Sequence, residues 1–362
     1  MSQRIHNFSA GPGALPLPVL QSAQRNLVNY EGSGMSLMEM SHRSAIYDDI
    51  HNACITDLRT LLGLSDDYEV LFMGGGARTQ FALVAMNLLR PQRRAAYINT
   101  GTWAVGALRE AKKSGDATLL WSSEETGHDR VPCDADWSLT GDEEYLHYTS
   151  NNTIFGTQYS GIPETGGVDL FCDMSSDILS RPVDTSRFAL IYAGAQKNMG
   201  PAGVTLVIVR KDLLERCPDN LPEVMNYRLV AGKSSMLNTP PVFPIYMVGL
   251  VAKHLLDLGG LAEVGTTNQA KNDAIYSAID GSGGFYTGHA QRDSRSQMNV
   301  TFRAGSDTLN QRFVAEATEA GMNGLKGHRS VGGLRASIYN AVPLGSVLAL
   351  TDFMGEFARR NG

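Results

Sequence analysis

The amino-acid sequence predicts an α/β fold, with a mainly parallel central sheet in a large domain and a smaller α+β domain at the C-terminal end. Helix-like and strand-like patterns alternate from residue 44 onward, as is typical of a layered α/β domain. A chain of 362 residues is long enough for about two domains. A second group of helix and strand patterns follows the Gly-Gly pair at 259–260.

The alternating elements follow one another in order along the chain. The first helix is predicted over Ser44–Leu62, because Gly63 provides its end. Short apolar runs then predict strands over Tyr68–Met73, Ala95–Asn99, Leu119–Trp121, Tyr145–Tyr148 and Val168–Cys172. The segments between them predict helices over Gln80–Leu89 and Trp103–Lys113.

Two further strands depart from this alternation. Phe188–Ala193 and Val204–Val209 both read as buried strands, and only ten residues separate them, of which the last six, 198–203, form the turn. A parallel crossover needs about a dozen residues or more. We therefore expect these two strands to be antiparallel neighbours.

The domain boundary is expected after a long helical run, Tyr246–Leu258. Two helix-like segments and strand patterns over Met298–Phe302 and Gly333–Ser337 come after it, which favours a smaller α+β domain. The expected large domain comprises residues 16–258, and the small domain comprises residues 1–15 and 259–362.

Composition narrows the class of protein. The 43% hydrophobic and 19% charged content is ordinary for a globular chain, and the net charge of −6 argues against a general nucleic-acid binder. The four cysteines are far apart, without metal-ligand spacing, so we expect no metal site and a reduced, cytoplasmic protein. Neither a signal-peptide pattern nor an eighteen-residue apolar run is present, so we expect no membrane partner.

Lys197 lies between two apolar runs, where a charged amine is costly. Neighbouring small residues and strands would remove the amine from water, which favours its neutral, nucleophilic form. Such an amine can attack an aldehyde and form a Schiff base. A single lysine at a strand end more commonly extends its amine to solvent, so the assignment depends on its neighbours.

Other strand ends carry polar groups that can meet Lys197, because ligands bind at the carboxyl ends of strands in such sheets. Asp173 closes "VDLFCD" and can hold a pyridine nitrogen protonated, or it can cap the following turn. The loop "GGGARTQ" (74–80) runs into a helix and offers backbone N–H groups to a phosphate. It is not a G-x-G-x-x-G fingerprint, because Thr79 occupies the third glycine position.

Trp103, just after the turn at Gly101, can stack on a flat ring or pack in the core. A further group of residues is typical of an anion site, since arginine binds phosphate or carboxylate bidentately. It comprises two His-Arg pairs and one arginine beside a Gly-Gly turn: His42, Arg43, His328, Arg329 and Arg335. Each pair alone is more often a solvated surface feature.

Taken together, six segments resemble the phosphoserine aminotransferase family of the class V aminotransferases: "SHR", "GGGARTQ", "DMSSDILSRP", "AGAQKNMGPAG", "SMLNTPP" and "KGHRSVGGLRASIYNA". The resemblance extends from "FSAGPG" near the start to "DFM" near the end. It implies a homodimeric pyridoxal-5′-phosphate enzyme of fold type I, with active sites shared between subunits. The implied reaction exchanges an amino group between L-glutamate and 3-phosphohydroxypyruvate in serine biosynthesis, with a related step in pyridoxine biosynthesis.

The resemblance also implies a role for each matching residue. Lys197 matches the Schiff-base lysine, Asp173 the partner of the pyridinium nitrogen, and Trp103 the residue stacked on the ring. Further cofactor contacts match Ala77, Arg78, Thr153 and Gln196, and, from the other subunit, Asn238 and Thr239. The substrate's phosphate or distal carboxylate is implied to meet His42, Arg43, His328 and Arg329, the last two across the dimer interface. Arg335 matches the arginine that binds the α-carboxylate.

Some residues depart from the family pattern, and rival functions remain. Ala77 and Thr79 stand where some members have glycines, and "SNNTI" around Thr153 replaces a more acidic stretch. The nearest rivals keep the cofactor: an alanine– or serine–glyoxylate aminotransferase, or a cysteine desulfurase. The missing third glycine argues against a nicotinamide-dependent dehydrogenase, and a non-catalytic binding protein would be colourless and unreactive to borohydride.

Overall fold

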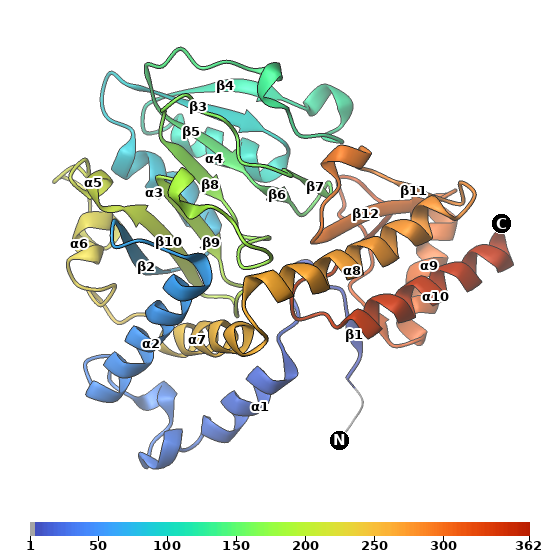
Figure 1. The fold of residues 1–362 in the computed structure, drawn as a ribbon, viewed down its shortest axis with the longest axis horizontal. Helices are drawn as coiled ribbons and strands as arrows, with labels where there is room; N and C mark the ends of the chain where they lie inside the picture. The colour runs from blue at the N-terminus through green and yellow to red at the C-terminus, as the bar shows by residue number, and fades with distance from the viewer. Residues whose placement is uncertain (1–3) are drawn as a thin grey trace.

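The computed structural model describes residues 4–362, which form a seven-stranded sheet and a separate three-stranded sheet (Figure 1). The large sheet has the strand order β2-β10-β9-β8-β5-β3-β4. Its strands are β2 (Tyr68–Gly74), β3 (Arg94–Asn99), β4 (Asp116–Ser122), β5 (Glu143–Thr149), β8 (Leu170–Asp173), β9 (Leu190–Gly194) and β10 (Val204–Arg210). Every neighbouring pair is parallel except those formed by β10. The predicted α/β fold with a mainly parallel sheet is therefore confirmed.

The pairing of β9 with β10 is antiparallel, as the short connection between them predicts. Leu206 pairs with Ala193, and Thr205 pairs with Gly194 at the end of β9. The short connection between these strands contains Lys197, so the lysine is held on a tight turn at the edge where the parallel strands end.

Helices cover both faces of the large sheet. Successive side chains of β2 alternate, so that Val70 and Phe72 pack in one apolar cluster and Leu71 and Met73 in the other. The first cluster includes residues of α2 and α7, and the second includes residues of α3 and α4. The helices of this region are α1 (Leu17–Asn26), α2 (Ala45–Leu62), α3 (Ala77–Leu88), α4 (Thr102–Ala111), α5 (Lys211–Leu214), α6 (Tyr227–Ala231) and α7 (Val242–Asp257).

The boundaries of these helices show where local patterns are sufficient. Ser44 caps α2 by accepting a hydrogen bond from the Tyr47 N–H, and Gly63 ends it with φ 59°, as predicted. By contrast, α3 begins at Ala77 rather than Gln80, because Gly76 in extended conformation starts the helix directly after the glycine loop. Similarly, α7 begins at Val242 rather than at the predicted Tyr246. Pro244 lies in its first turn, where backbone N–H groups have no partner within the helix, so the missing N–H of proline costs no hydrogen bond.

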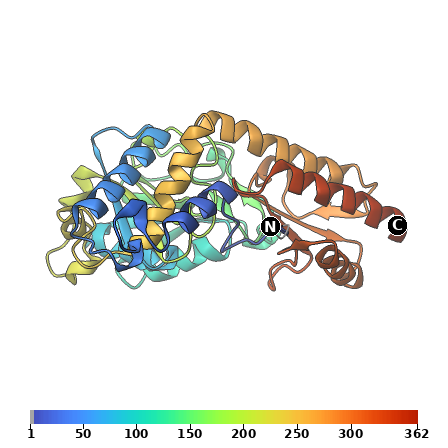
Figure 2. The ribbon, with the colours of Figure 1, turned by 90° about the horizontal axis from the view of Figure 1, so that it is seen from below.

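The C-terminal part forms a second body with its own apolar core (Figure 2). Its elements are α8 (Leu261–Asp280), β11 (Tyr286–Gly288), β12 (Asn299–Ala304), α9 (Asp307–Glu319), β13 (Met322–Asn323), β14 (Leu334–Ser337) and α10 (Leu344–Asn361). The antiparallel strands β11, β12 and β14 form the small sheet. The predicted strands here are found within two residues of their expected bounds.

The N-terminal segment belongs to this second body. Strand β1 (His6–Asn7) pairs in parallel with β13, and Phe8 is fully buried in the C-terminal core.

Helices α7 and α8 meet at 87° across a short break. The division into residues 16–258 and residues 1–15 with 259–362 stays a prediction, supported by the separate cores; residues 1–3 lie outside the described chain. No single helix within residues 4–362 could span a membrane by length and hydropathy; α7 and α8, bent at 87°, meet that condition only as a pair.

A short hairpin links the two bodies: β6 (Asn151–Asn152) and β7 (Thr157–Gln158) pair with each other after β5. Asn151 donates a hydrogen bond to Asn299 Oδ1 of β12 at 2.8 Å, and Thr157 makes a bridge to Arg295. The hairpin therefore fixes Thr153 and Ile154 between the large sheet and the small one.

Candidate active site

A cavity of about 410 Å³ lies at the carboxyl ends of the parallel strands, closed on one side by the C-terminal body. Nine of the predicted site residues line it: Ala77, Arg78, Trp103, Thr153, Asp173, Gln196, Lys197, His328 and Arg335. They come from six separate segments of the chain, so the strand-end rule and the resemblance lead to one place.

Lys197 points into this cavity. Its Nζ lies 3.5 Å from Thr153 Oγ1 and 5.3 Å from the centre of the Trp103 ring. Burial lowers the pKa of Lys197, while the nearby Asp173 carboxylate opposes that shift and Arg335 adds to it. The amine is thus held where a larger share of it is neutral than in water, which a nucleophile requires.

Asp173 ends β8 and is buried beside Lys197. Its Oδ1 accepts two hydrogen bonds from Ser175, one from the backbone N–H at 2.9 Å and one from Oγ at 2.6 Å. Burial raises the pKa of Asp173, and Lys197 and Ser175 oppose the shift. Within residues 4–362, Oδ2 has no hydrogen-bond partner, so one oxygen caps the turn and the other is available to a ligand.

Ser175 is a site residue that the sequence reasoning missed. Besides donating to Asp173, its Oγ accepts a hydrogen bond from the Gly194 N–H at 3.0 Å, which ties the end of β8 to the end of β9. The "DMS" spacing, an aspartate followed two residues later by a serine, is the local signal that could have indicated it.

Trp103 forms one wall of the cavity from the first turn of α4. Its Nε1 donates to Thr153 Oγ1 at 2.9 Å, so the ring is fixed in orientation. Gly101 precedes it with φ 142°, and a Cβ there would lie 2.6 Å from side-chain atoms of Asn152 and Phe155. Only glycine permits this approach, which places the indole at the cavity, where it also packs against the apolar cluster that includes α3 and α4.

The first turn of α3 offers an anion site. The N-cap residue, Gly76, has no side chain that could cap the helix. Within residues 4–362, no hydrogen bond engages the backbone N–H groups of Ala77 and Arg78. A Cβ on Gly194 would lie 3.3 Å from the Ala77 nitrogen, so strand β9 approaches this helix start closely. Free N–H groups and the helix dipole favour a phosphate here.

Arg335 and His328 enter from the C-terminal body. Arg335, on β14, donates from Nη1 to the Thr153 carbonyl at 3.0 Å, while its Nε is buried without a partner in the described chain. Burial lowers the pKa of Arg335, and it lowers the pKa of His328 with help from Arg335 and Arg329. A buried donor without a partner beside a cavity suits the carboxylate of a ligand.

Five predicted residues do not line this cavity in the single chain: His42, Arg43, Asn238, Thr239 and Arg329. All but His42 are exposed, and His42 is partly buried. The cavity instead includes residues that no local pattern marked, namely Ala10, Gly11, Phe81 and Ile154. Small and apolar residues carry no chemical signal, and only the tertiary fold brings them there.

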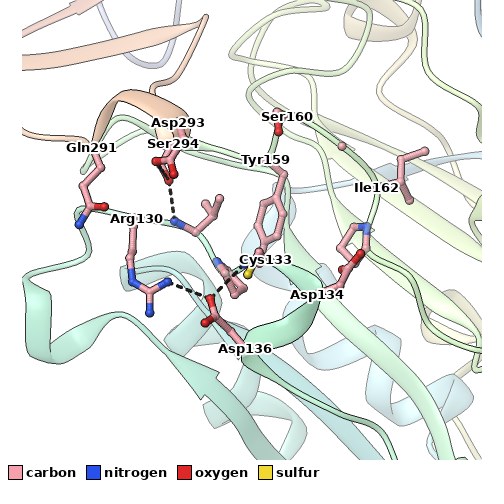
Figure 3. Close-up of a pocket in the computed structure, with 14 residues that line it drawn as sticks. Arg130, Cys133, Asp134, Asp136, Tyr159, Ser160, Ile162, Gln291, Asp293 and Ser294 are labelled. Atoms are coloured by element: carbon pink, nitrogen blue, oxygen red, sulfur yellow. Dashed lines mark hydrogen bonds and ion pairs between the residues drawn. The ribbon is translucent and has the colours of Figure 1, made fainter.

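A second hollow, of about 370 Å³, lies elsewhere between the two bodies (Figure 3). Arg130 is paired with Asp136 at 2.8 Å on its floor, and Ser294 Oγ accepts from the Val131 N–H on the other side. None of the predicted site residues lines it. Because its arginine is already neutralised, the first cavity is the better candidate for an anionic ligand.

Comparisons with known proteins agree with this geometry. Residues 5–350 match the family model described as aminotransferase class-V. A phosphoserine aminotransferase from Desulfatibacillum aliphaticivorans is 54% identical over the full length of both chains. The structure of phosphoserine aminotransferase from Bacillus circulans subsp. alkalophilus has a TM-score of 0.98 at 52% identity, covering all of both chains. A pyridoxal-phosphate-bound phosphoserine aminotransferase from Trichomonas vaginalis has a TM-score of 0.91 at 36% identity, covering 97% of this chain and 99% of that one.

The fold and the lysine-containing cavity thus define an aminotransferase of class V. Within that class, the full-length identity of about half is far above what the fold alone requires. The chain belongs to the phosphoserine aminotransferase family.

Proposed function

We propose that this protein transfers an amino group between L-glutamate and 3-phosphohydroxypyruvate, producing 2-oxoglutarate and O-phospho-L-serine for serine biosynthesis. Full-length relatives at about half identity carry the phosphoserine aminotransferase name. The observation that carries the proposal is the juxtaposition of Lys197, Asp173 and Trp103 in one cavity. The nearest alternative is another class V enzyme, such as a serine–glyoxylate aminotransferase.

The cavity fits pyridoxal 5′-phosphate in each of its parts. The unpaired Asp173 Oδ2 suits a protonated ring nitrogen, the Trp103 indole suits a ring face, and the free N–H groups at the start of α3 suit a phosphate. Thr153, Gln196 and Arg78 complete the lining. When bound, pyridoxal phosphate carries the amino group between the two substrates and withdraws electrons from the carbon that loses its proton.

Each residue then has a task that follows from its position. Lys197 Nζ would hold the cofactor through its aldehyde, and as a free amine it would take the α-proton of the substrate as a general base. Asp173 holds a proton at the ring nitrogen through Oδ2. Trp103 covers the ring and excludes water. Arg335 binds the α-carboxylate bidentately, which orients the α-carbon toward Lys197. Repetition with the second substrate gives a ping-pong cycle.

The remaining anion-binding residues require a second copy of the chain. Arg43 and Arg329 are charged but, like His42, lie outside the cavity of one chain, and Asn238 and Thr239 are exposed. We propose a homodimer in which Asn238 and Thr239 reach the partner's cofactor phosphate and Arg329 reaches the partner's substrate. His328, which the resemblance implies would cross with Arg329, lines the cavity of its own chain. Exposed apolar side chains near the N-terminus, Val28 (80% exposed) and Met38 (60% exposed), support a surface that another copy covers.

Two finer assignments belong to the same proposal. The phosphohydroxythreonine step of pyridoxine biosynthesis is included, because its substrate also combines a phosphate with an amino acid. A cytoplasmic location is supported by the four cysteines, all of which are free thiols.

The test is an absorbance spectrum of the purified protein with and without L-glutamate, followed by borohydride reduction and peptide mapping. A yellow band that shifts with glutamate, and a label on Lys197, are expected. A label on another residue, or none, would refute the assignment. Rates with O-phosphoserine, compared with serine and alanine, separate this reaction from that of a glyoxylate aminotransferase. A sulfide-release assay with cysteine tests for a desulfurase.

A further inference from the structure

Lys271 is a fully buried lysine that the proposed reaction does not use. It lies on α8, the helix of the C-terminal body that begins just after α7 (Figure 1). No carboxylate lies within ion-pair distance of it in the described chain. Burial lowers the pKa of Lys271 to about 7, so the residue is costly to keep charged.

The amine instead donates hydrogen bonds to three backbone carbonyl groups. Lys271 Nζ donates to the carbonyls of Ile338 at 2.9 Å, Tyr339 at 2.8 Å and Val342 at 3.2 Å. These carbonyls belong to the irregular segment between β14 and α10, which has no sheet or helix ladder of its own. Three donors on one atom therefore fix the path of this segment.

The segment held by Lys271 reaches the cavity by two routes. Tyr339 donates its hydroxyl proton to the Ala10 carbonyl at 2.7 Å, and Ala10 lines the cavity. The Asn340 N–H donates to Asn198 Oδ1 at 2.9 Å, and Asn198 directly follows Lys197. One turn before Lys271, Asn268 donates to Asn340 Oδ1 at 2.8 Å, so α8 holds this asparagine as well.

The contacts leave little room for movement. Gly13 donates its N–H to the Gln196 carbonyl at 2.7 Å. A Cβ on Gly13 would lie 2.6 Å from the Lys197 carbonyl oxygen and 2.9 Å from the Tyr339 ring. The Tyr339 ring, the N-terminal segment and the Lys197 turn are therefore in direct contact, and a shift of one displaces the others.

We propose that Lys271 is a positioning residue for the transamination, which holds Tyr339 and Asn340 so that the Lys197 turn and the Ala10–Gly13 segment keep their places in the cavity. This inference rests on the proposed function. A displacement of about 1 Å at a reacting group can lower a rate about a hundredfold, so a clamp of this kind has a measurable effect.

The test compares Lys271→Met, which keeps the shape and removes the donors, with Lys253→Met, a matched change at an exposed lysine of α7 that pairs only with Asp257. Thermal midpoints are measured first, and kinetics are run well below the lower midpoint. We expect Lys271→Met to lower kcat at least about tenfold at saturating cofactor. We also expect it to move the pH midpoint of the bound cofactor's absorbance, whereas Lys253→Met should match the wild type in both.

Hydrogen exchange on the cofactor-free proteins gives a readout independent of activity. Lys271→Met should speed exchange at the Gly13 amide and the Asn340 amide, and Lys253→Met should not. If Lys271→Met does not fold, Tyr339→Phe takes its place. It removes the hydroxyl that donates to Ala10 and that accepts a bond of 3.2 Å from Asn299 Nδ2, and it should show the same loss of kcat with faster exchange at Gly13.

A folded Lys271→Met protein, or Tyr339→Phe in its place, with kcat within about twofold of the wild type and unchanged exchange at Gly13 would overturn the inference. Failure of the proposed function looks different, because the wild type itself would then show no label at Lys197. In that case the exchange measurement still decides whether Lys271 holds these segments.

Discussion

The two halves of the proposed site differ in how completely one chain builds them. The cofactor half is formed by buried strand ends and helix starts, where Asp173, Ser175 and Trp103 already have their hydrogen-bond partners. The predicted phosphate half is dispersed, with Arg43 and Arg329 exposed and apart from the cavity. The difference shows that the sheet of one chain builds most of the cofactor half, whereas in the proposed dimer the charged substrate is recognised by loops that a second copy completes.

The strongest test of the preformed half is Lys197→Ala. It removes the nucleophile and the general base together, so turnover should fall by about 10⁴-fold or more. Steady-state rates at saturating glutamate provide the measurement, and a circular dichroism spectrum serves as the control for folding. Retention of more than a small residual rate would mean that the cofactor half does not depend on this amine.

A smaller loss is expected from Asp173→Asn. The amide keeps the shape but cannot hold a proton at the ring nitrogen as a carboxylate does, so kcat should fall by about 100-fold to 1000-fold. Cofactor content, measured by absorbance after gel filtration, should fall much less. An activity near that of the wild type would show that the buried carboxylate only caps its turn.

The dispersed half is tested by Arg329→Ala. KM for O-phosphoserine should rise by about tenfold or more, because a charge-assisted contact to the phosphate is lost, while the cofactor spectrum stays unchanged. If Arg329 acts on the partner's site, mixing this variant with Lys197→Ala should regenerate one intact site per mixed dimer, or about a quarter of the wild-type rate. No recovery on mixing would show that a single chain supplies both Lys197 and Arg329 to each site.

The smallest expected effect concerns the junction of the two bodies. Phe155 lies between His128 and His289, at ring-centre distances of 4.7 Å and 5.8 Å. Burial lowers the pKa of both histidines; His289 lowers the pKa of His128 further, and Arg303 lowers that of His289. The unfolded chain therefore binds more protons below about pH 6.5, and stability is complete above that pH and falls as the pH drops through the lowered values.

Urea midpoints between pH 5 and 8 measure this dependence. The variant His128→Asn/His289→Gln should flatten the decline below pH 6.5, and His254→Gln on α7 is the matched control. An equal decline in both variants would show that the junction is not the acid-sensitive contact.

Much of the fold follows from local pattern, and the exceptions have physical causes. The ends of α2 carry their own signals in Ser44 and Gly63, and the short connection between β9 and β10 is enough to predict an antiparallel pair. The start of α3 was missed because glycines rarely mark a helix, although the loop needs them for close approach. Where an element begins or ends is set by contacts distant in sequence when the local pattern carries no signal.

The same holds for the site. Lys197 and Asp173 stand at strand ends, where chemistry and topology both mark them. Ser175 could have been predicted, since a serine two residues after Asp173 is typical of a turn in which the aspartate accepts its N–H. Ala10 and Gly11 were not, because nothing in the first fifteen residues indicates that they return to the cavity.

That return has a consequence for synthesis on the ribosome. Strand β1 finds its partner only in β13, so the first residues to emerge wait, unpaired, while almost the whole chain is translated. Phe8 must stay exposed or be shielded by a chaperone until Met322 and Asn323 appear. A truncated chain that stops before Met322 should therefore leave its N-terminal segment accessible to protease, even when the large sheet has already folded.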